Sequence, residues 1–162
     1  MYDTEKDLLD GLHAGPAMLE GLLARCTQEE AAEARGGDEG WSVVEVVCHL
    51  RDCEERAVER AVAMRDSDDP VLEGYDQDAW ARERHYAADD LRRAFTAFCH
   101  YRAQHVAALG ALSSAGWQRT GRHTEMGSIT ILGQAQHIAA HDAIHAAQIA
   151  RQLGLATPHA SD

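Results

Sequence analysis

Apolar residues recur at helical spacing through most of this chain, and almost nothing in it interrupts a helix. Only three prolines occur, at positions 16, 70 and 158, and runs of alternating β-branched, aromatic and polar residues are missing. Proline breaks helices, and strict alternation is the pattern of a half-buried strand. At 162 residues the chain is long enough to bury one core without disulfides. The sequence therefore predicts an all-α fold in a single domain, residues 1–162.

The first predicted helix runs from about Thr4 to Cys26, with leucines on one face. We expect Gly15-Pro16 to kink or restart it, because proline removes a helical hydrogen bond. Thr27 to Glu30 has the pattern of a capping box that opens a short extra turn, and the glycine-rich residues 36–40 end that piece.

The second predicted helix has the clearest start signal in the chain. Ser42 can accept a hydrogen bond from the Glu45 amide while the Glu45 side chain returns to the Ser42 amide, which is a capping box. Apolar residues follow on one stripe as far as about Asp66. Residues 66–88 then form a long polar connection, and a loop of this length inside a compact domain is more often functional than idle.

Two more helices are predicted in the second half of the chain. The segment 89–112 alternates steps of four and three between apolar positions, and Arg102 and His105 lie within that apolar stripe. After a second connection, residues 113–128, a last helix is expected from Thr130, a preferred N-cap, to Gly154, a preferred C-terminal residue. The expected architecture is a four-helix bundle with two longer interhelical connections.

The charge of the chain excludes several classes of partner. The chain contains 15 Lys and Arg and 27 Asp and Glu, which gives a net charge of -12, and the acidic residues are scattered along it. Binding DNA or RNA requires clustered basic residues, so we expect no nucleic-acid partner, and the same argument disfavours an anionic membrane surface. No apolar run of about 18 residues occurs, and the acidic N-terminus lacks the pattern of a signal peptide. A cytoplasmic location is expected.

The four cysteines form no CxxC pair. In a reducing compartment, isolated cysteines are usually small buried hydrophobic residues. That is the expectation for Cys26, Cys48, Cys53 and Cys99.

Three histidines, His137, His141 and His145, follow one another at intervals of four residues within the last predicted helix. Residues four apart on an α-helix rise about 6 Å and differ by about 40° in direction, so two such imidazoles can reach one ion. His137 and His145 start about 12 Å apart along the axis, too far to share a metal comfortably. The spacing therefore predicts a pair, either the first two or the last two.

The apolar stripe of this helix favours the second pair. His145 shares the inward stripe with Ile138 and Ile149. His141 flanks that stripe, whereas His137 is expected at the mouth of a site or against another element. The alternative is that a helix rich in Ala and His simply exposes some histidines, because one pair at this spacing often occurs without metal.

His49, in the second helix, is a third candidate. It lies at the edge of the apolar stripe, where a buried neutral imidazole needs a partner for each ring nitrogen. A metal bound from across the bundle would satisfy one nitrogen, and a carboxylate or carbonyl would hold the other. Asp52 and Glu45 lie on the same side of the helix and are candidates for that supporting role, with ordinary solvated acids as the alternative.

The segment Trp41-Ser42-x2-Glu45-x3-His49-Leu50 is followed about ninety residues later by His141-x3-His145-x2-Gln148-Ile149. In order, spacing and helix placement the two segments resemble the DinB-like superfamily, with its YfiT-like proteins, over nearly the whole chain. The resemblance implies a four-helix bundle, often a homodimer, with one divalent metal bound by three histidines, here His49, His141 and His145. His123, in a segment similar to the H-x3-G loop of some relatives, is a further site candidate.

Family branches include thiol S-transferases, a mycothiol-dependent isomerase and metal-dependent hydrolases. The resemblance therefore implies a metal-dependent enzyme acting on a small molecule, first a thiol S-transferase that uses a low-molecular-weight thiol. A hydrolase and a non-catalytic, metal-stabilised binding module are the alternatives. Histidine ligation suits zinc or nickel, and open coordination positions distinguish catalytic sites from closed structural ones.

The remaining candidates have structural alternatives. Arg102 either pairs with a carboxylate, which we favour because buried charges are generally paired, or faces a pocket for an anionic substrate group. His105 likewise either has a buried polar partner or faces the pocket. The aromatic residues of the connections, Tyr75, Trp80 and Trp117, line either the mouth of a pocket or the core.

Two other metal motifs are disfavoured. His141-Asp142-x2-His145 resembles the zincin H-E-x-x-H motif, but Asp reaches less far than Glu and only His159 follows as a further ligand. A di-iron bundle needs paired E-x-x-H motifs, and none occurs.

Overall fold

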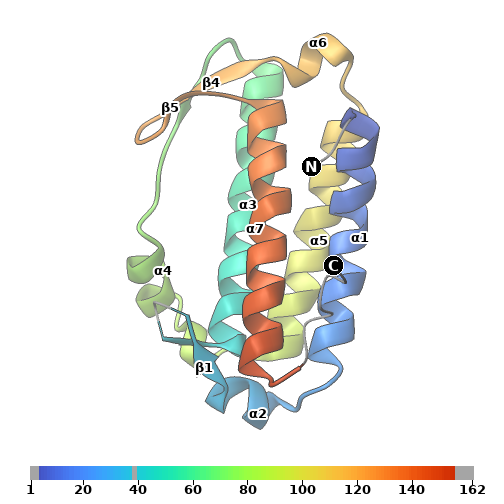
Figure 1. The fold of residues 1–162 in the computed structure, drawn as a ribbon. Coiled ribbons are helices and arrows are strands. Elements are labelled where there is room, and N and C mark those ends of the chain that lie inside the picture. The colour runs from blue at the N-terminus through green and yellow to red at the C-terminus, as the bar shows by residue number, and fades with distance from the viewer. Residues whose placement is uncertain (1–3, 38–39, 156–162) are drawn as a thin grey trace.

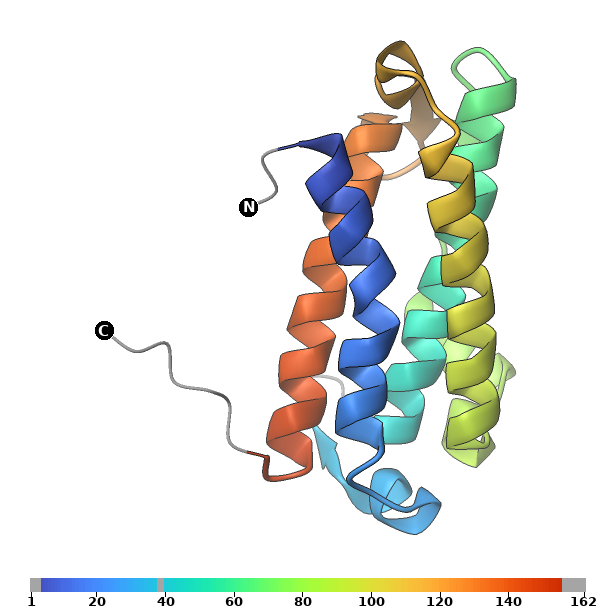
Figure 2. The ribbon, with the colours of Figure 1, turned by 90° about the vertical axis from the view of Figure 1, so that its right-hand side faces the viewer.

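Four long helices lie side by side in the computed structural model, which describes residues 4–37 and 40–155. They are α1 (Glu5–Leu23), α3 (Val43–Asp66), α5 (Leu91–Gly110) and α7 (Ile131–Gln152). Each packs mainly against two others, in the ring order α1, α5, α3, α7, and Figures 1 and 2 show the bundle from two sides. The predicted all-α four-helix bundle is confirmed. His159 lies outside the described residues.

The helix starts follow the capping signals in the sequence. Ser42 and Glu45 form the expected capping box at the start of α3, and Thr27 and Glu30 form another at α2 (Gln28–Glu33). Thr130 caps α7 by accepting a hydrogen bond from the Gly133 amide. These side chains satisfy backbone amides that have no partner inside a helix, which fixes where each helix begins.

Pro16 lies inside α1, which runs from Glu5 to Leu23. We expected a kink or a restart there, and the helix does not restart. Proline has no N–H, so the carbonyl of Leu12, four residues earlier, loses its helical partner. Arg102 on α5 donates to that carbonyl from Nη1 at 2.9 Å. The neighbouring helix therefore replaces the hydrogen bond that Pro16 removes.

The two long connections contain secondary structure that the sequence did not predict. The first holds β3 (Val71–Leu72), α4 (Gln77–Glu83) and the 3-10 helix η1 (Tyr86–Ala88); the second holds α6 (Ser114–Trp117), β4 (Thr120–His123) and β5 (Gly127–Thr130). β4 lies in the middle of a small sheet, parallel to β3 and antiparallel to β5. β1 (Arg35–Gly36) pairs with β2 (Trp41–Ser42). Strands of two to four residues are too short to show alternation.

Two apolar clusters form the core, and polar side chains separate them. One cluster surrounds Leu19, Leu50 and Phe98, and the other surrounds Leu12 and Leu109. Between them along the helices lie the buried polar residues Glu54 of α3, Arg102 and His105 of α5, and Asp142 of α7. The bundle therefore has a buried polar layer at mid-height.

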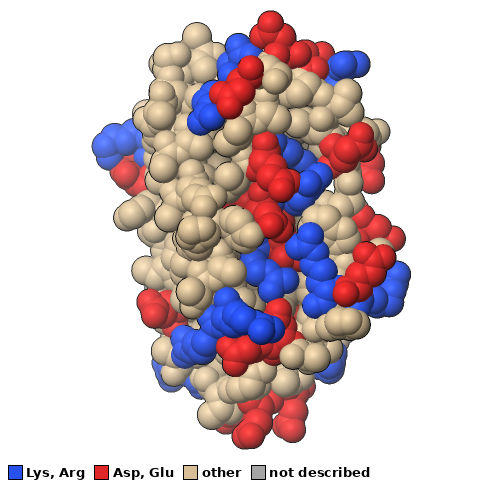
Figure 3. Space-filling model, turned by 180° about the vertical axis from the view of Figure 1, so that it is seen from behind, with Lys and Arg blue, Asp and Glu red and all other residues tan. Residues whose placement is uncertain are grey.

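No helix in the described part of the chain is long and apolar enough to cross a membrane. The face drawn in Figure 3 carries basic and acidic side chains next to one another, and no broad patch of basic residues is visible on it. That mixture agrees with the acidic composition of the chain.

Candidate metal centre

Three imidazoles meet between α3 and α7. Nε2 of His49 lies 2.9 Å from Nε2 of His141, and Nε2 of His145 lies 3.1 Å from that same atom. The ring centroid of His49 is 4.9 Å from that of His141 and 5.0 Å from that of His145. Residues separated by about ninety positions in the sequence thus place the same ring nitrogen next to Nε2 of His141.

Burial keeps the rings of His49 and His141 neutral. Burial, with a smaller contribution from neighbouring His145, lowers the pKa of His49 to about 3. Burial and then His49 lower the pKa of His141 to about 2. At neutral pH each of these two rings therefore has an unprotonated nitrogen, and a neutral imidazole is the form that binds a metal.

Gln148 orients the third imidazole. Its Oε1 lies 2.8 Å from Nδ1 of His145, so this nitrogen carries the proton and donates it. The lone pair of His145 is consequently on Nε2, the atom that faces His141. Such a hydrogen bond from the outer nitrogen is the usual way in which proteins fix a metal-binding histidine.

Cys53 also reaches this cluster, which the sequence interpretation of the cysteines missed. Its Sγ lies 3.5 Å from Nε2 of His49 and 4.0 Å from Nε2 of His141, and Oη of Tyr75 is 2.7 Å away. Burial raises the pKa of the Cys53 thiol to about 12. The signal that could have found it is spacing, because Cys53 follows His49 by four residues on one helix.

The donor atoms fit a transition metal ion. One atom each from His49, Cys53 and His141 lie within 4.8 Å of one another. Nitrogen and sulfur donors of this kind bind zinc and similar ions, and water or a substrate occupies a further position in catalytic sites.

A buried ion-pair network lies behind the cluster. Arg102, with 1% of its surface exposed, donates from Nη2 to Oε2 of Glu54 at 2.8 Å and pairs through Nη1 with Oδ2 of Asp142 at 2.8 Å. His105 Nδ1 lies 2.7 Å from Oε1 of Glu54. Burial alone would raise the pKa of Glu54, but hydrogen bonds from His105 and Arg102 lower it to about 2. The network joins α1, α3, α5 and α7 next to the imidazoles.

The profile of the DinB superfamily matches residues 12–149 of this chain. The chain belongs to the DinB superfamily. The comparison with curated proteins finds no match.

Two solved structures share this fold. YfiT from Bacillus subtilis, described as a probable metal-dependent hydrolase with an unusual four-helix bundle topology, superposes with a TM-score of 0.82 at 21% identity, covering 96% of this chain and 91% of YfiT. A mycothiol-dependent maleylpyruvate isomerase superposes with a TM-score of 0.76 at 11% identity, covering 90% of this chain and 60% of the isomerase. At these identities, the likeness shows the fold.

In this member of the DinB superfamily, the acidic residues proposed to support His49 lie elsewhere. Asp52 accepts a hydrogen bond from Tyr86 and pairs with Arg51 and Arg84. Glu45 completes its capping box and pairs with Arg35. Neither carboxylate contacts His49 in the described structure. Asp142, the residue that would act as the base in a zincin, is instead held by Arg102.

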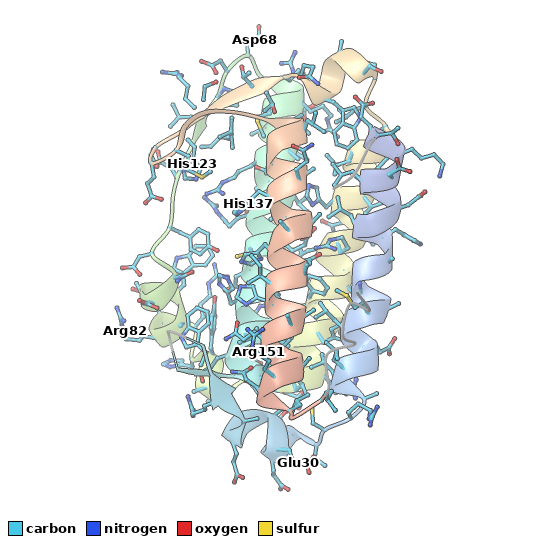
Figure 4. All side chains as sticks on the ribbon, in the orientation of Figure 1. Glu30, Asp68, Arg82, His123, His137 and Arg151 are labelled. Carbon is cyan, nitrogen blue, oxygen red and sulfur yellow. The ribbon has the colours of Figure 1, made fainter. Side chains whose placement is uncertain are left out.

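His137 and His123 border a pocket beside the cluster. Figure 4 shows His123 on the β4–β5 hairpin and His137 on α7, both toward the side along which the first connection passes. The pocket has a volume of about 420 Å³, and Arg60 and Gln134 also line it. The ring of His137, an exposed residue, is 6.0 Å from that of His141. The pocket thus lies next to the imidazoles, on the side toward the start of α7.

Proposed function

We propose that this protein is a metal-dependent enzyme that binds one divalent transition metal through His49, His141 and His145. The observation that carries the proposal is how close their Nε2 atoms lie. Nε2 of His141 is 2.9 Å from that of His49 and 3.1 Å from that of His145. Side chains with unprotonated nitrogens at such short separations are arranged to share a cation. Zinc and nickel are the metals best suited to this donor set.

The reaction we propose is the transfer of a low-molecular-weight thiol to an electrophilic small molecule. A metal at this position would favour the thiolate form of the co-substrate, which is the nucleophilic form. The pocket lined by His123, His137 and Arg60 is the proposed entrance for the electrophile. The mycothiol-dependent relative supports this choice, since it shares the fold and uses a thiol.

The protein's own side chains hold the site in a form ready for this reaction. Gln148 keeps the proton of His145 on Nδ1. The ring of Trp41 packs on His49 with centroids 5.1 Å apart, which excludes water from that side of the ring. We propose that these two contacts maintain the orientation of the imidazoles before any ligand binds.

The test begins with metal content and then measures turnover. Protein loaded with zinc or nickel should hold roughly one ion per chain by mass spectrometry. It should also accelerate the conjugation of a small thiol to monochlorobimane. His49→Ala should lose metal and slow conjugation by at least about 100-fold, more than the loss of an outer partner costs. His100→Ala is the matched control, because His100 is an exposed histidine on α5.

The outcomes separate the alternatives. Protein that takes up no metal overturns the proposal, and conjugation that is equal in wild type and His49→Ala overturns the transferase reaction. The second candidate is a metal-dependent hydrolase, which the likeness to YfiT favours, and metal-dependent ester hydrolysis without thiol conjugation would support it. Metal binding without any turnover would support a binding module. The homodimer and the cytoplasmic location stay predictions, the first checked by light scattering.

A further inference from the structure

Cys53 differs from the other cysteines in what its sulfur contacts. Sγ of Cys48 donates to Asp89 at 3.5 Å, and Sγ of Cys26 donates to the carbonyl of Leu23 at 3.5 Å. Within residues 4–37 and 40–155, the sulfur of Cys53 alone contacts imidazole nitrogens. Its position is therefore not that of a packing residue.

The distances around Cys53 match those between ligands of one tetrahedral ion. Metal bonds of about 2.05 Å to nitrogen and 2.3 Å to sulfur put two nitrogens about 3.3 Å apart and a nitrogen and sulfur about 3.6 Å apart. Nε2 of His141 lies 2.9 Å from Nε2 of His49 and 3.1 Å from Nε2 of His145. Sγ of Cys53 lies 3.5 Å from Nε2 of His49 and 4.0 Å from Nε2 of His141. The sulfur thus lies at the distance expected of a ligand that shares a metal with His49 and His141.

We propose that Cys53 is a fourth and exchangeable ligand of the metal centre, bound through Sγ whenever no co-substrate thiol is present. The inference rests on the proposed function, since it requires a metal at the three histidines. On metal binding the S–H bond of Cys53 breaks, its sulfur forms the metal bond and its proton passes to the solvent. The closed site is then protected from other ligands.

Exchange explains how a closed site admits a co-substrate. When the sulfur of an incoming thiol replaces Sγ, the proton of that thiol passes to Cys53, which becomes a neutral thiol again. Tyr75, whose Oη is 2.7 Å from Sγ, is in place to hydrogen-bond the released thiol. Cys53 therefore serves as the base for its own replacement, and no further acid or base is needed.

Cobalt(II) tests the ligand directly, because a thiolate bound to cobalt gives a charge-transfer band in the near ultraviolet. Wild type and Cys99→Ala, a control for a half-buried cysteine on α5, should show the band with one cobalt per chain. Cys53→Ala should lose the band and bind cobalt at least about tenfold more weakly. Cys53→Ser, closer in shape, repeats the test if the alanine variant is unstable.

The results distinguish this inference from the proposed function. Full cobalt content without the band in wild type, or a band unchanged in Cys53→Ala and Cys53→Ser, overturns the role of Cys53 and leaves the histidine site intact. Absence of cobalt from wild type overturns both.

Proton release tests the exchange. Adding N-acetylcysteine to cobalt-loaded wild type in weak buffer should release almost no protons, because Cys53 takes the proton. In cobalt-loaded Cys53→Ala, at a pH low enough for the open position to hold water rather than hydroxide, the same addition should release about one proton per thiol bound, since the displaced water takes up no proton. Equal release by the two proteins would contradict exchange.

Discussion

Oε1 of Gln148 lies 2.8 Å from Nδ1 of His145, and this contact decides which nitrogen of the ring can bind a metal. The amide oxygen accepts the ring proton, so the lone pair is on Nε2, 3.1 Å from His141. Gln148 is itself buried and donates to the carbonyl of Gly36 at 3.4 Å, which limits its rotation. The β1–β2 segment therefore helps to orient a side chain at the centre of the bundle.

Gln148→Ala should weaken metal binding by about 10- to 100-fold, the usual cost of losing the partner of a ligating histidine. Competition with a chromophoric chelator measures the affinity. Gln152→Ala is the control, because Gln152 also donates to a backbone carbonyl, that of Trp41, but contacts no imidazole. Equal affinities for the wild type and Gln148→Ala would show that the hydrogen bond has no role in binding.

Gly15→Ala should destabilise the protein by about 1 to 3 kcal/mol, because it overpacks the buried ion pair. A Cβ at Gly15 would lie 2.8 Å from Nη1 of Arg102 and 3.1 Å from Oδ2 of Asp142. Arg102 cannot move aside without losing its carboxylate partners. Urea unfolding measures the change.

Gly21→Ala is the matched control on the same helix. No atom lies within 4 Å of a Cβ at Gly21, so the usual gain of about 0.5 to 1 kcal/mol for Ala over Gly should appear. If Gly15→Ala stabilised the protein equally, the ion pair would have room that the structure does not show.

Arg102→Met should cost about 3 to 5 kcal/mol of unfolding free energy, because it leaves two buried carboxylates without their cation. It also removes the donor that satisfies the Leu12 carbonyl beside Pro16. Pro16→Ala in the Arg102→Met background should restore part of that loss, since an alanine amide can donate to Leu12. No recovery in the double variant would argue against the link between these two residues.

Asp89→Asn should lower stability at neutral pH, and the difference from wild type should vanish in acid. Burial alone would raise the pKa of Asp89, but hydrogen bonds from Arg93 and Arg51 lower it to about 2, below its ordinary 3.8. A depressed folded pKa means that the carboxylate stabilises the fold above pH 3.8 and that this is lost as the pH falls through 2.

The expected difference is about 1 to 2 kcal/mol at pH 7, reduced from the full linkage value because Arg93 is exposed to screening solvent. Urea unfolding of wild type and Asp89→Asn along a pH series measures it. Asp68→Asn is the control, with a fully exposed side chain, and should stay within about 0.5 kcal/mol of wild type. A difference that kept its full neutral-pH size at pH 2 would contradict the assignment.

Local signals in the sequence were sufficient to predict the long helices. Capping boxes and N-caps act within four residues, so Ser42 and Thr130 identified two helix starts directly. The strands were missed because β3 and β4 exist through a pairing between residues fifty positions apart. Such short strands have no pattern of their own. Of the kink or restart expected at Pro16, the restart does not occur, and Arg102 from another helix replaces the missing hydrogen bond.

The site was predicted only in part, again because spacing within one helix can be read from the sequence and contacts between distant residues cannot. Helical spacing brought His141 and His145 together. The position of His49 at the edge of its apolar stripe made it a third candidate, and the family resemblance implied the three as one ligand set. Cys53 was interpreted as a buried hydrophobic residue, although its spacing from His49 is that of the histidine pair. The separation of Asp52 from His49 depends on Tyr86 and Arg84, which arrive from the first connection. No local pattern in the sequence predicts that contact.

The parallel pairing of β3 with β4 joins the two connections that flank the site. Tyr75, three residues after β3, reaches the sulfur of Cys53, and His123, the last residue of β4, borders the pocket. Insertions or deletions in either loop would change the surroundings of Cys53 and the wall of the pocket together while the histidine-bearing helices kept their positions. Descendants of one ancestral bundle could in this way acquire new substrates and retain the same histidine cluster.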